Sequence, residues 1–299
     1  MDLEKEIIQK ENKFLQFELW ADCKNGCDFC YNRFISTSVS KINSLKKTLC
    51  RIKNVEFCDT IGLIGGEFFD GQMKENEYLL FKKVILEISK KIKEEKVNRL
   101  LIATSLIFES TMFDEFLQYL KELNIEKNVV ICTSYDTIYR FKNNGLTLWE
   151  NNVRKINSTN IKTHIELIVT HHFIQQVLSG QFDIVAFSEK YAARLDFIEP
   201  TVRNFKNKEQ ANKIIPLFLP RKKEFISFLV FLNKKGLLTK DFLSSSLRSN
   251  TIFYYDSRDG RTFTSDRQKY DPFSSSYFYD CEESILEVTQ QFKKITGLL

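Results

Sequence analysis

The stretch A-D-C-K-N-G-C-D-F-C-Y, residues 21–31, holds Cys23, Cys27 and Cys30 in the spacing C-x3-C-x2-C. Three thiolates so close in sequence can bind one metal centre from a single loop. Iron–sulfur clusters are held by cysteine thiolates, and a [4Fe–4S] cluster contains four irons. Three cysteines leave one iron without a protein ligand, and an open iron can bind a small molecule. The stretch therefore indicates a cluster that acts as a reagent rather than as an electron wire.

An aromatic residue precedes the last cysteine of this loop, Phe29, and the triplet Gly65-Gly66-Glu67 follows farther along the chain. Together with the cysteine spacing, these residues resemble the radical S-adenosylmethionine (radical SAM) superfamily. The resemblance implies a [4Fe–4S] cluster on the three cysteines, with S-adenosylmethionine (AdoMet) bound at the open iron. It implies reductive cleavage of AdoMet to a 5′-deoxyadenosyl radical, which abstracts a hydrogen atom from a substrate. A flavodoxin- or ferredoxin-like protein is the implied electron donor.

A zinc site is the main alternative for the three cysteines. Structural zinc usually takes four protein ligands, often from paired C-x2-C units. The nearest further cysteines, Cys50 and Cys58, fall on different expected elements and lack that pairing. A second functional class therefore stays open, a zinc-stabilised or iron–sulfur binding module without catalysis.

Composition places the chain among globular α/β proteins. It has 299 residues, of which 43% are hydrophobic, so a sizeable core can form. The formal charge of +5 permits an anionic partner but does not argue for one, because both signs are interspersed. Seven cysteines are an odd number without a regular disulfide framework. No stretch approaches the ~18 apolar residues of a membrane span, and residues 1–12 do not read as a secretion signal. We therefore expect a cytoplasmic protein without membrane contact.

Strands and helices are expected to alternate along the first two thirds of the chain. Such alternation implies β-α-β units and a parallel sheet. The resemblance makes this an α/β fold, a partial (β/α)6 barrel, over residues 1–205. Strands are expected at residues 14–20, 60–64, 100–104, 128–133, 164–170 and 194–198, with a further candidate at 182–187, and helices at residues 41–52, 77–96, 112–123, 146–156 and 173–178.

The alternation stops after about residue 205, and residues 206–299 are expected to form an α+β extension that flanks the substrate opening. Residues 213–219 and 224–235 have helical patterns, and residues 282–295 predict a closing helix. Residues 252–264 predict a hairpin with Asp259-Gly260 at its turn.

Polar residues follow the expected strands, at the end of the sheet where parallel α/β folds gather functional residues. Glycines allow a backbone to approach a ligand closely. By the resemblance, Gly65, Gly66 and the Glu67 carboxylate accept hydrogen bonds from the AdoMet ammonium. Two further segments follow the third and fourth strands, Thr104-Ser105-Leu106 where many relatives carry T-N-G, and S-Y-D from Ser134 to Asp136 where they carry S-L-D-G.

By the resemblance, Thr104, Ser134 and Asp136 are expected to bind the carboxylate and the ribose hydroxyls of AdoMet. Arg140 follows closely and is expected to bind a carboxylate. The missing Asn and Gly of these motifs leave helix capping open as an alternative role. Phe29 is expected against the adenine and Tyr31 beside the cluster, with core packing as the alternative.

Four other residues have no settled role. His171 and His172 follow the fifth strand and Glu199 follows the sixth, so each is either a substrate contact or a structural residue. Cys281 is the one cysteine of the extension, and one cysteine cannot hold a cluster, so no auxiliary cluster is expected there.

The substrate has two candidate classes. A peptide or protein is slightly favoured, because S-Y-D and the hairpin are reminiscent of peptide-modifying relatives. A nucleotide or nucleic acid is the alternative, because Arg221-Lys222-Lys223 and an aromatic hairpin can contact phosphates and unpaired bases.

Overall fold

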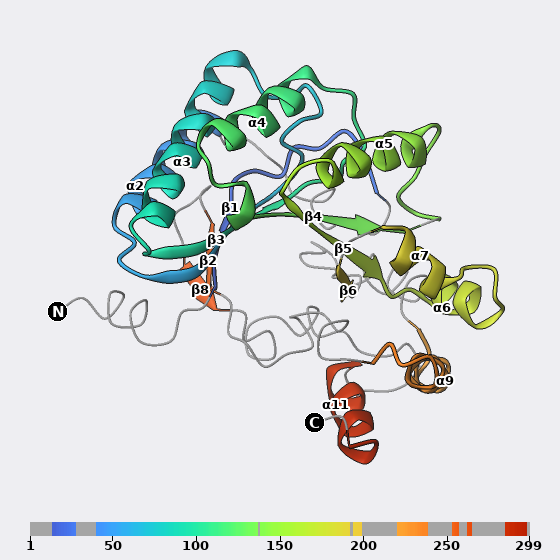
Figure 1. The fold of residues 1–299 in the computed structure, drawn as a ribbon. Helices are drawn as coiled ribbons and strands as arrows, with labels where there is room; N and C mark the ends of the chain where they lie inside the picture. Colours follow the sequence, from blue (N-terminus) through green and yellow to red (C-terminus); the bar gives the residue numbers. More distant parts are fainter. Residues whose placement is uncertain are drawn as a thin grey trace, which may run out of the picture.

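One curved sheet organises the chain (Figure 1). The computed structural model describes residues 14–27, 40–136, 138–191, 194–198, 220–238, 253–256, 262–264 and 285–297. The strand order is β6-β5-β4-β3-β2-β1-β7-β8, in which every neighbouring pair is parallel except β7 and β8. The strands are β1 (Phe14–Glu18), β2 (Cys58–Ile64), β3 (Val97–Ala103), β4 (Val129–Tyr135), β5 (Lys162–Ile168), β6 (Arg194–Ile198), β7 (Phe253–Asp256) and β8 (Thr262–Thr264).

Helices connect the first six strands and cover one face of the sheet. Figure 1 shows α2 to α5 side by side on the outer side of the curved strands. This arrangement confirms the expected parallel α/β fold and its partial (β/α)6 barrel. The helices are α2 (Lys41–Lys53), α3 (Glu75–Lys93), α4 (Thr111–Glu122), α5 (Gly145–Asn157), α6 (His171–Leu178), α7 (Ile184–Lys190), α9 (Lys222–Lys234) and α11 (Ile285–Ile295), with a 3-10 turn η2 (Glu126–Asn128) before β4.

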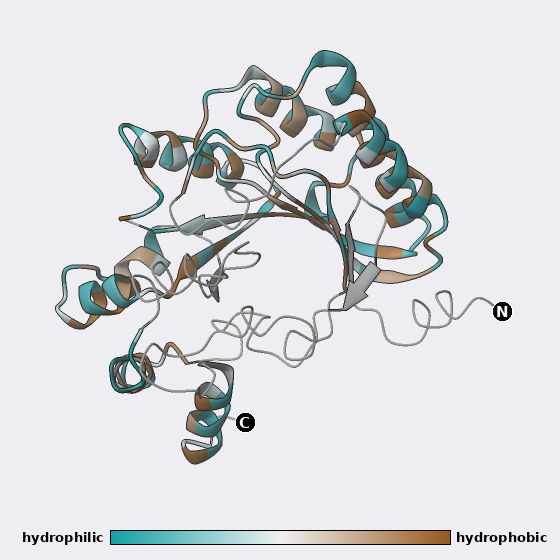
Figure 2. Ribbon diagram, turned by 180° about the vertical axis from the view of Figure 1, so that it is seen from behind, coloured by the Kyte–Doolittle hydropathy of each residue, from teal (hydrophilic) through white to brown (hydrophobic). Residues whose placement is uncertain are grey.

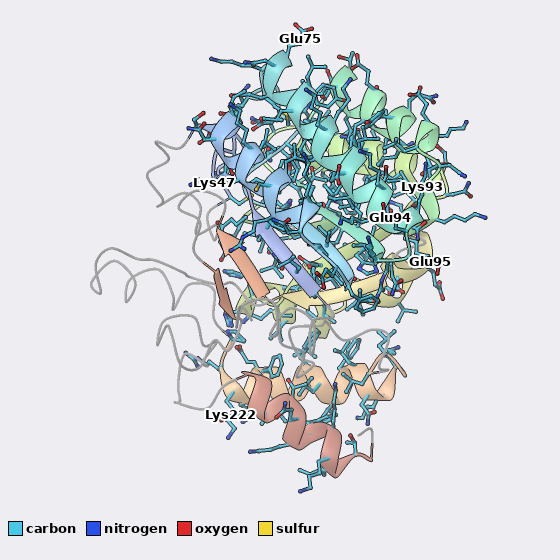
Figure 3. All side chains as sticks on the ribbon, turned by 90° about the vertical axis from the view of Figure 1, so that its left-hand side faces the viewer. Lys47, Glu75, Lys93, Glu94, Glu95 and Lys222 are labelled. Carbon is cyan, nitrogen blue, oxygen red and sulfur yellow. The ribbon has the colours of Figure 1, made fainter. Side chains whose placement is uncertain are left out.

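The core lies between the sheet and these helices. Alternate strand residues such as Phe17, Leu63 and Ile102 are fully buried there. A cluster of phenylalanines fills the space under α3 and α4, with the ring of Phe69 centred 5.1 Å from those of Phe113 and Phe116. The outer sides of the helices are hydrophilic (Figure 2), and the labelled Glu75 and Lys93 point away from the sheet at the two ends of α3 (Figure 3).

Residues 182–187 contain the start of a helix rather than a strand, so that strand prediction is wrong. Asp183 ends the loop after α6, and its carboxylate accepts hydrogen bonds from the backbone N–H groups of Val185 and Ala186, both at 3.0 Å. This is the N-cap arrangement, which satisfies donors that the first turn leaves open. The apolar residues that suggested a strand pack into the aromatic cluster around Tyr135, where the Phe187 ring lies 4.6 Å away.

Two described elements of the C-terminal part, β7 and α9, contact the barrel. Strand β7 pairs with β1, which extends the sheet, and its antiparallel pairing with β8 confirms the expected hairpin. Helix α9 lies on α6, where Phe228 packs against Phe173 at 6.1 Å between ring centroids. Residues 213–219 and 259–260 lie outside the described residues, and the boundary at residue 205 stays a prediction. In the part of the chain that is described, no helix is long and apolar enough to cross a membrane.

Candidate functional site

The loop after β1 continues the pairing of β1 with β2 beyond the ends of both strands. Leu19 N–H donates to the Ile64 carbonyl at 2.9 Å, and Gly66 N–H donates to the Trp20 carbonyl at 2.6 Å. Glu67 N–H then donates to the Asp22 carbonyl at 2.8 Å. The chain that leads into Cys23 is therefore fixed along the Gly65-Gly66-Glu67 segment, backbone to backbone.

This contact leaves no room for a side chain on either glycine. A Cβ atom on Gly65 would lie 2.3 Å from the Trp20 carbonyl oxygen, and one on Gly66 would lie 1.8 Å from that of Asp22. Gly65 also has a φ of +150°, which side-chain-bearing residues rarely adopt. The glycine pair is thus required by the docking of the cysteine loop.

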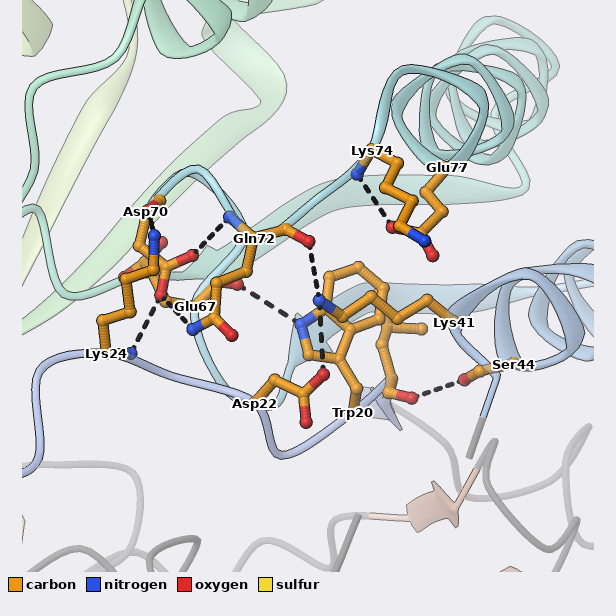
Figure 4. Close-up of polar contacts among 11 residues, drawn as sticks. Trp20, Asp22, Lys24, Lys41, Ser44, Glu67, Asp70, Gln72, Lys74 and Glu77 are labelled. Atoms are coloured by element: carbon orange, nitrogen blue, oxygen red, sulfur yellow. Dashed lines mark hydrogen bonds and ion pairs between the residues drawn. The ribbon is translucent and has the colours of Figure 1, made fainter. Parts of the chain in front are cut away.

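A lysine and an aspartate fasten the same loop from its other side (Figure 4). The buried Lys41 ammonium lies 3.3 Å from the Asp22 carboxylate and donates to the Gln72 carbonyl at 3.1 Å. Farther along, Lys24 N–H donates to the Asp70 carboxylate at 2.9 Å. These contacts connect the loop to the start of α2 and to the segment after Glu67.

Glu67 lies inside the protein, with 1% of its surface exposed. One carboxylate oxygen accepts the backbone N–H groups of Phe68 and Phe69, at 2.8 and 3.1 Å, and the Thr104 hydroxyl at 2.7 Å. The other oxygen accepts Ser105 N–H at 2.6 Å. Burial raises the pKa of the Glu67 carboxyl, while these hydrogen bonds oppose the rise. The carboxylate therefore connects the end of β2 to the end of β3.

The segment after β3 contains a positive φ angle of the kind that glycine usually adopts, although the residue there is a leucine. Leu106, at the Gly position of T-N-G, has a φ of +59° and is fully buried. The Asn152 side chain donates to the Leu106 carbonyl at 3.0 Å and to the Phe108 carbonyl at 2.8 Å. A left-handed leucine costs roughly 1–2 kcal/mol, and burial together with these two hydrogen bonds offsets that cost.

The turn after β4 brings a cation to the cysteine loop. The buried Asp136 carboxylate accepts the N–H groups of Ile138 and Tyr139, the first at 3.0 Å, and burial raises its pKa. This turn presents Arg140, whose guanidinium donates to the Cys27 sulfur at 3.9 Å and to the Ser105 carbonyl at 3.4 Å. Arg140 and Cys27 are both buried, at 7% and 6% exposure.

The structure thus gathers most of the predicted site residues that it describes at one end of the sheet. Cys23, which is partly exposed, precedes Cys27 on the docked loop. Ser134, on β4, pairs in register with Glu166 of β5 and is partly exposed. Phe29, Cys30, Tyr31, Glu199 and Cys281 lie outside the described residues. Within the described part of the chain, to which Cys30 does not belong, no three His, Cys, Asp or Glu side chains form a metal-binding group.

The two adjacent histidines contact different partners. His171 Nδ1 lies 2.8 Å from a Glu224 carboxylate oxygen and so joins α6 to α9. The His172 ring is centred 5.9 Å from that of Tyr139, in the turn that carries Arg140. The structural alternative for His171 therefore has a specific contact, and a substrate contact remains a prediction.

Sequence reasoning missed the side chains that hold the cysteine loop, Lys41, Asp70 and Lys142. Lys142 donates to the Gly26 carbonyl at 3.0 Å. One signal was available for Lys41, because a lysine at the first position of a helix opposes the helix dipole and needs an anionic partner. Asp70 and Lys142 give no such signal, because their partners on the cysteine loop are backbone groups distant in sequence.

Comparison with solved structures gives the fold a precedent. Neither a protein-family model nor a curated protein matches the sequence. The structure of anSMEcpe with bound AdoMet and a Kp18Cys peptide matches with a TM-score of 0.52 and 14% identity, over 92% of this chain and 81% of that one. Streptococcus suis SuiB bound to its precursor peptide SuiA matches with a TM-score of 0.54 and 13% identity, over 96% of this chain.

The match to SuiB spans 66% of the SuiB chain. A second anSMEcpe structure, with AdoMet and a Cp18Cys peptide, matches with a TM-score of 0.51 and 14% identity, and this match spans 59% of that chain. Identities of this size show a shared fold. The sheet and its helices are accordingly the partial barrel of radical SAM enzymes.

We predict that Gly66→Ala displaces the cysteine loop. Its new methyl group would overlap the Asp22 carbonyl, so the loop or the glycine segment must move. We expect a loss of roughly 3 kcal/mol or more in the free energy of unfolding, measured with urea. Gly145→Ala is the matched control, because its Cβ would meet side chains alone, that of Ile107 at 3.3 Å and that of Phe141 at 3.8 Å. Equal stability of the two variants would contradict the docking.

A second prediction concerns the Glu67 carboxylate. In the hydrogen bonds given above, both Glu67 carboxylate oxygens act as acceptors. Glu67→Gln keeps the shape of the side chain but replaces one of these oxygens with an NH2 group, which then faces a donor of the protein. We expect the free energy of unfolding at pH 7 to fall by about 1–3 kcal/mol. Glu109→Gln, at an exposed position nearby, should change it by less than about 0.5 kcal/mol. A Glu67→Gln variant as stable as the parent protein would show that the carboxylate does not join the two strand ends.

Proposed function

We propose that this chain, which has the fold of radical SAM enzymes, is itself such an enzyme, with a [4Fe–4S] cluster on Cys23, Cys27 and Cys30. The observation that supports this best is the docking of the cysteine loop on Gly65 and Gly66, at the carboxyl ends of the strands. A cluster held by these cysteines would supply the one electron that reductive cleavage of AdoMet requires, and hydrogen-atom abstraction from the substrate would follow.

The described residues fit an anionic group held by the loop. Cys27 is buried beside the Arg140 guanidinium, and among the described residues Arg140 Nε has no hydrogen-bond partner. A buried cation with an unused donor favours negative charge nearby. Partial exposure of Cys23 leaves access from the open side of the loop. The zinc alternative would need a fourth ligand, and the other described cysteines near the loop in sequence, Cys50 and Cys58, lie on α2 and β2.

The chain's own part in the proposed reaction is to bind and orient AdoMet and to shield it from water. Gly65, Gly66 and Glu67 carry the loop, and we propose that their backbone oxygens face the AdoMet ammonium. Thr104, Ser134, Asp136 and Arg140 are proposed for its carboxylate and ribose, and Phe29 and Tyr31 for its adenine side and the cluster. A flavodoxin- or ferredoxin-like donor and a cytoplasmic location complete the proposal.

A peptide or protein is the substrate class that we propose. Two matching structures, anSMEcpe and SuiB, contain bound peptides, and both share this barrel. A nucleic acid is the alternative, because Arg221 and Lys223 are exposed at the start of α9. Helix α9 contacts the barrel through α6, so its position suits a segment that controls access.

Anaerobic reconstitution tests the cluster and the chemistry together. The parent protein should take up about four irons per chain and, with dithionite, convert AdoMet slowly to 5′-deoxyadenosine and methionine. Cys23→Ala and Cys27→Ala should lose the iron and the activity, because each removes a ligand. Cys50→Ala, which removes an exposed thiol on α2, should keep both. Tightly bound zinc in protein purified without oxygen would contradict the proposal and favour a non-catalytic binding module.

Single-stranded DNA binding, measured against salt, tests the substrate class. Contacts with phosphates make log affinity fall steeply with log salt. We expect weak binding, little changed by Arg221→Gln together with Lys223→Gln, because the net charge is small. Strong, salt-sensitive binding that these changes abolish would favour the nucleic-acid alternative over a peptide.

A further inference from the structure

Arg140 is a buried cation whose hydrogen-bonding capacity is only partly used. A guanidinium has five N–H donors and is always charged. Two of its nitrogens have partners, the Cys27 sulfur at 3.9 Å and the Ser105 carbonyl at 3.4 Å, both longer than a charge-assisted bond usually is. Its Nε has no partner within the described residues. Such a group is stable inside a protein when negative charge lies beside it, and the Asp136 carboxylate supplies part of this charge, since the Arg140 charge acts to lower the pKa of that carboxyl.

The surroundings fix the guanidinium in place. Asp136 shapes the turn that carries it, and the His172 ring packs near Tyr139 within that turn. The Ser105 carbonyl that accepts from Arg140 also accepts the Thr133 hydroxyl at 3.1 Å. Arg140 is therefore held between the end of β3 and the cysteine loop, where it contacts Cys27.

We propose that Arg140 is a positioning residue for the Cys27 thiolate, and that its N–H···S contact and charge make the cluster easier to reduce. The inference rests on the proposed function, since it needs a cluster on Cys27. Hydrogen bonds to cluster sulfurs and nearby charge are two factors that set the reduction potential of iron–sulfur clusters. One electron enters from an external one-electron reductant, no bond forms or breaks, and the fixed cation stabilises the added negative charge.

A second cation on the same segment provides a matched comparison. Lys142 also contacts the cysteine loop, but its ammonium donates to the backbone carbonyl of Gly26, and its side chain is exposed. Solvent and salt screen an exposed charge much more than a buried one. Of these two positive charges, we therefore expect only that of Arg140 to act strongly on the cluster.

The test is a potential titration of the reconstituted full chain without AdoMet, followed by the electron paramagnetic resonance signal of the reduced cluster. In Arg140→Gln, the ratio of reduced to oxidised cluster at a fixed potential should fall about tenfold, a shift of ~59 mV to more negative potential for one electron. Arg140→Lys, which keeps the charge, should shift less. Lys142→Gln should titrate like the parent protein.

Several outcomes would overturn the proposal. An unchanged potential in Arg140→Gln, with AdoMet binding lost, would assign Arg140 to the AdoMet carboxylate alone. Equal shifts in Arg140→Gln and Lys142→Gln would indicate a general effect of net charge. If Arg140→Gln takes up no iron, a parental potential in Arg140→Lys overturns the proposal and a negative shift supports it. A parent protein that binds no cluster would instead refute the proposed function, and this inference with it.

Discussion

The close approach of two backbones, residues 20–22 against Gly65 and Gly66, is the constraint on which the arrangement of this site depends. Because glycine has no Cβ atom, the cysteine loop can lie directly on the end of β2, and this close approach leaves no room for a side chain at either position. Three backbone hydrogen bonds join residues 19–22 to residues 64–67 and so place Cys23 at the carboxyl end of the sheet. The other anchors of the loop, such as Lys41 on Asp22, act on a backbone that these glycines have already positioned.

A network of hydrogen bonds connects Glu67 to both ends of the described part of the cysteine loop, Asp22 and Cys27. Glu67 accepts Ser105 N–H, the Ser105 carbonyl accepts Arg140, and Arg140 reaches Cys27. Glu67 N–H returns to Asp22 at the start of the loop. Its carboxylate already has four donors from the chain, and these compete with the expected contact to the AdoMet ammonium. The network is buried, where polar contacts are stronger and unpaired groups are costly, so its parts support one another.

The C-terminal part of the chain covers places that a partial barrel leaves open. A sheet edge exposes unpaired N–H and C=O groups, and β7 and β8 extend the sheet beyond β1. Helix α9 is attached at α6 through His171 and Glu224, and through Phe173 and Phe228. These two contacts hold α9 against the barrel.

Local pattern was enough to predict the strands β1 to β6, the hairpin and, among the α-helices of the described residues, all except α7, because hydrophobic periodicity and turn residues act over a few positions. It failed at residues 182–187, where an N-cap at Asp183 outweighs an apolar run. Motif spacing also indicated Cys23, Cys27 and the glycine pair. The contacts of Lys41, Asp70, Arg140 and Lys142 depend on how distant segments meet in space. Arg140 lies 113 positions from Cys27 in sequence, and the two side chains meet because β4, β3, β2 and β1 are consecutive strands of one sheet.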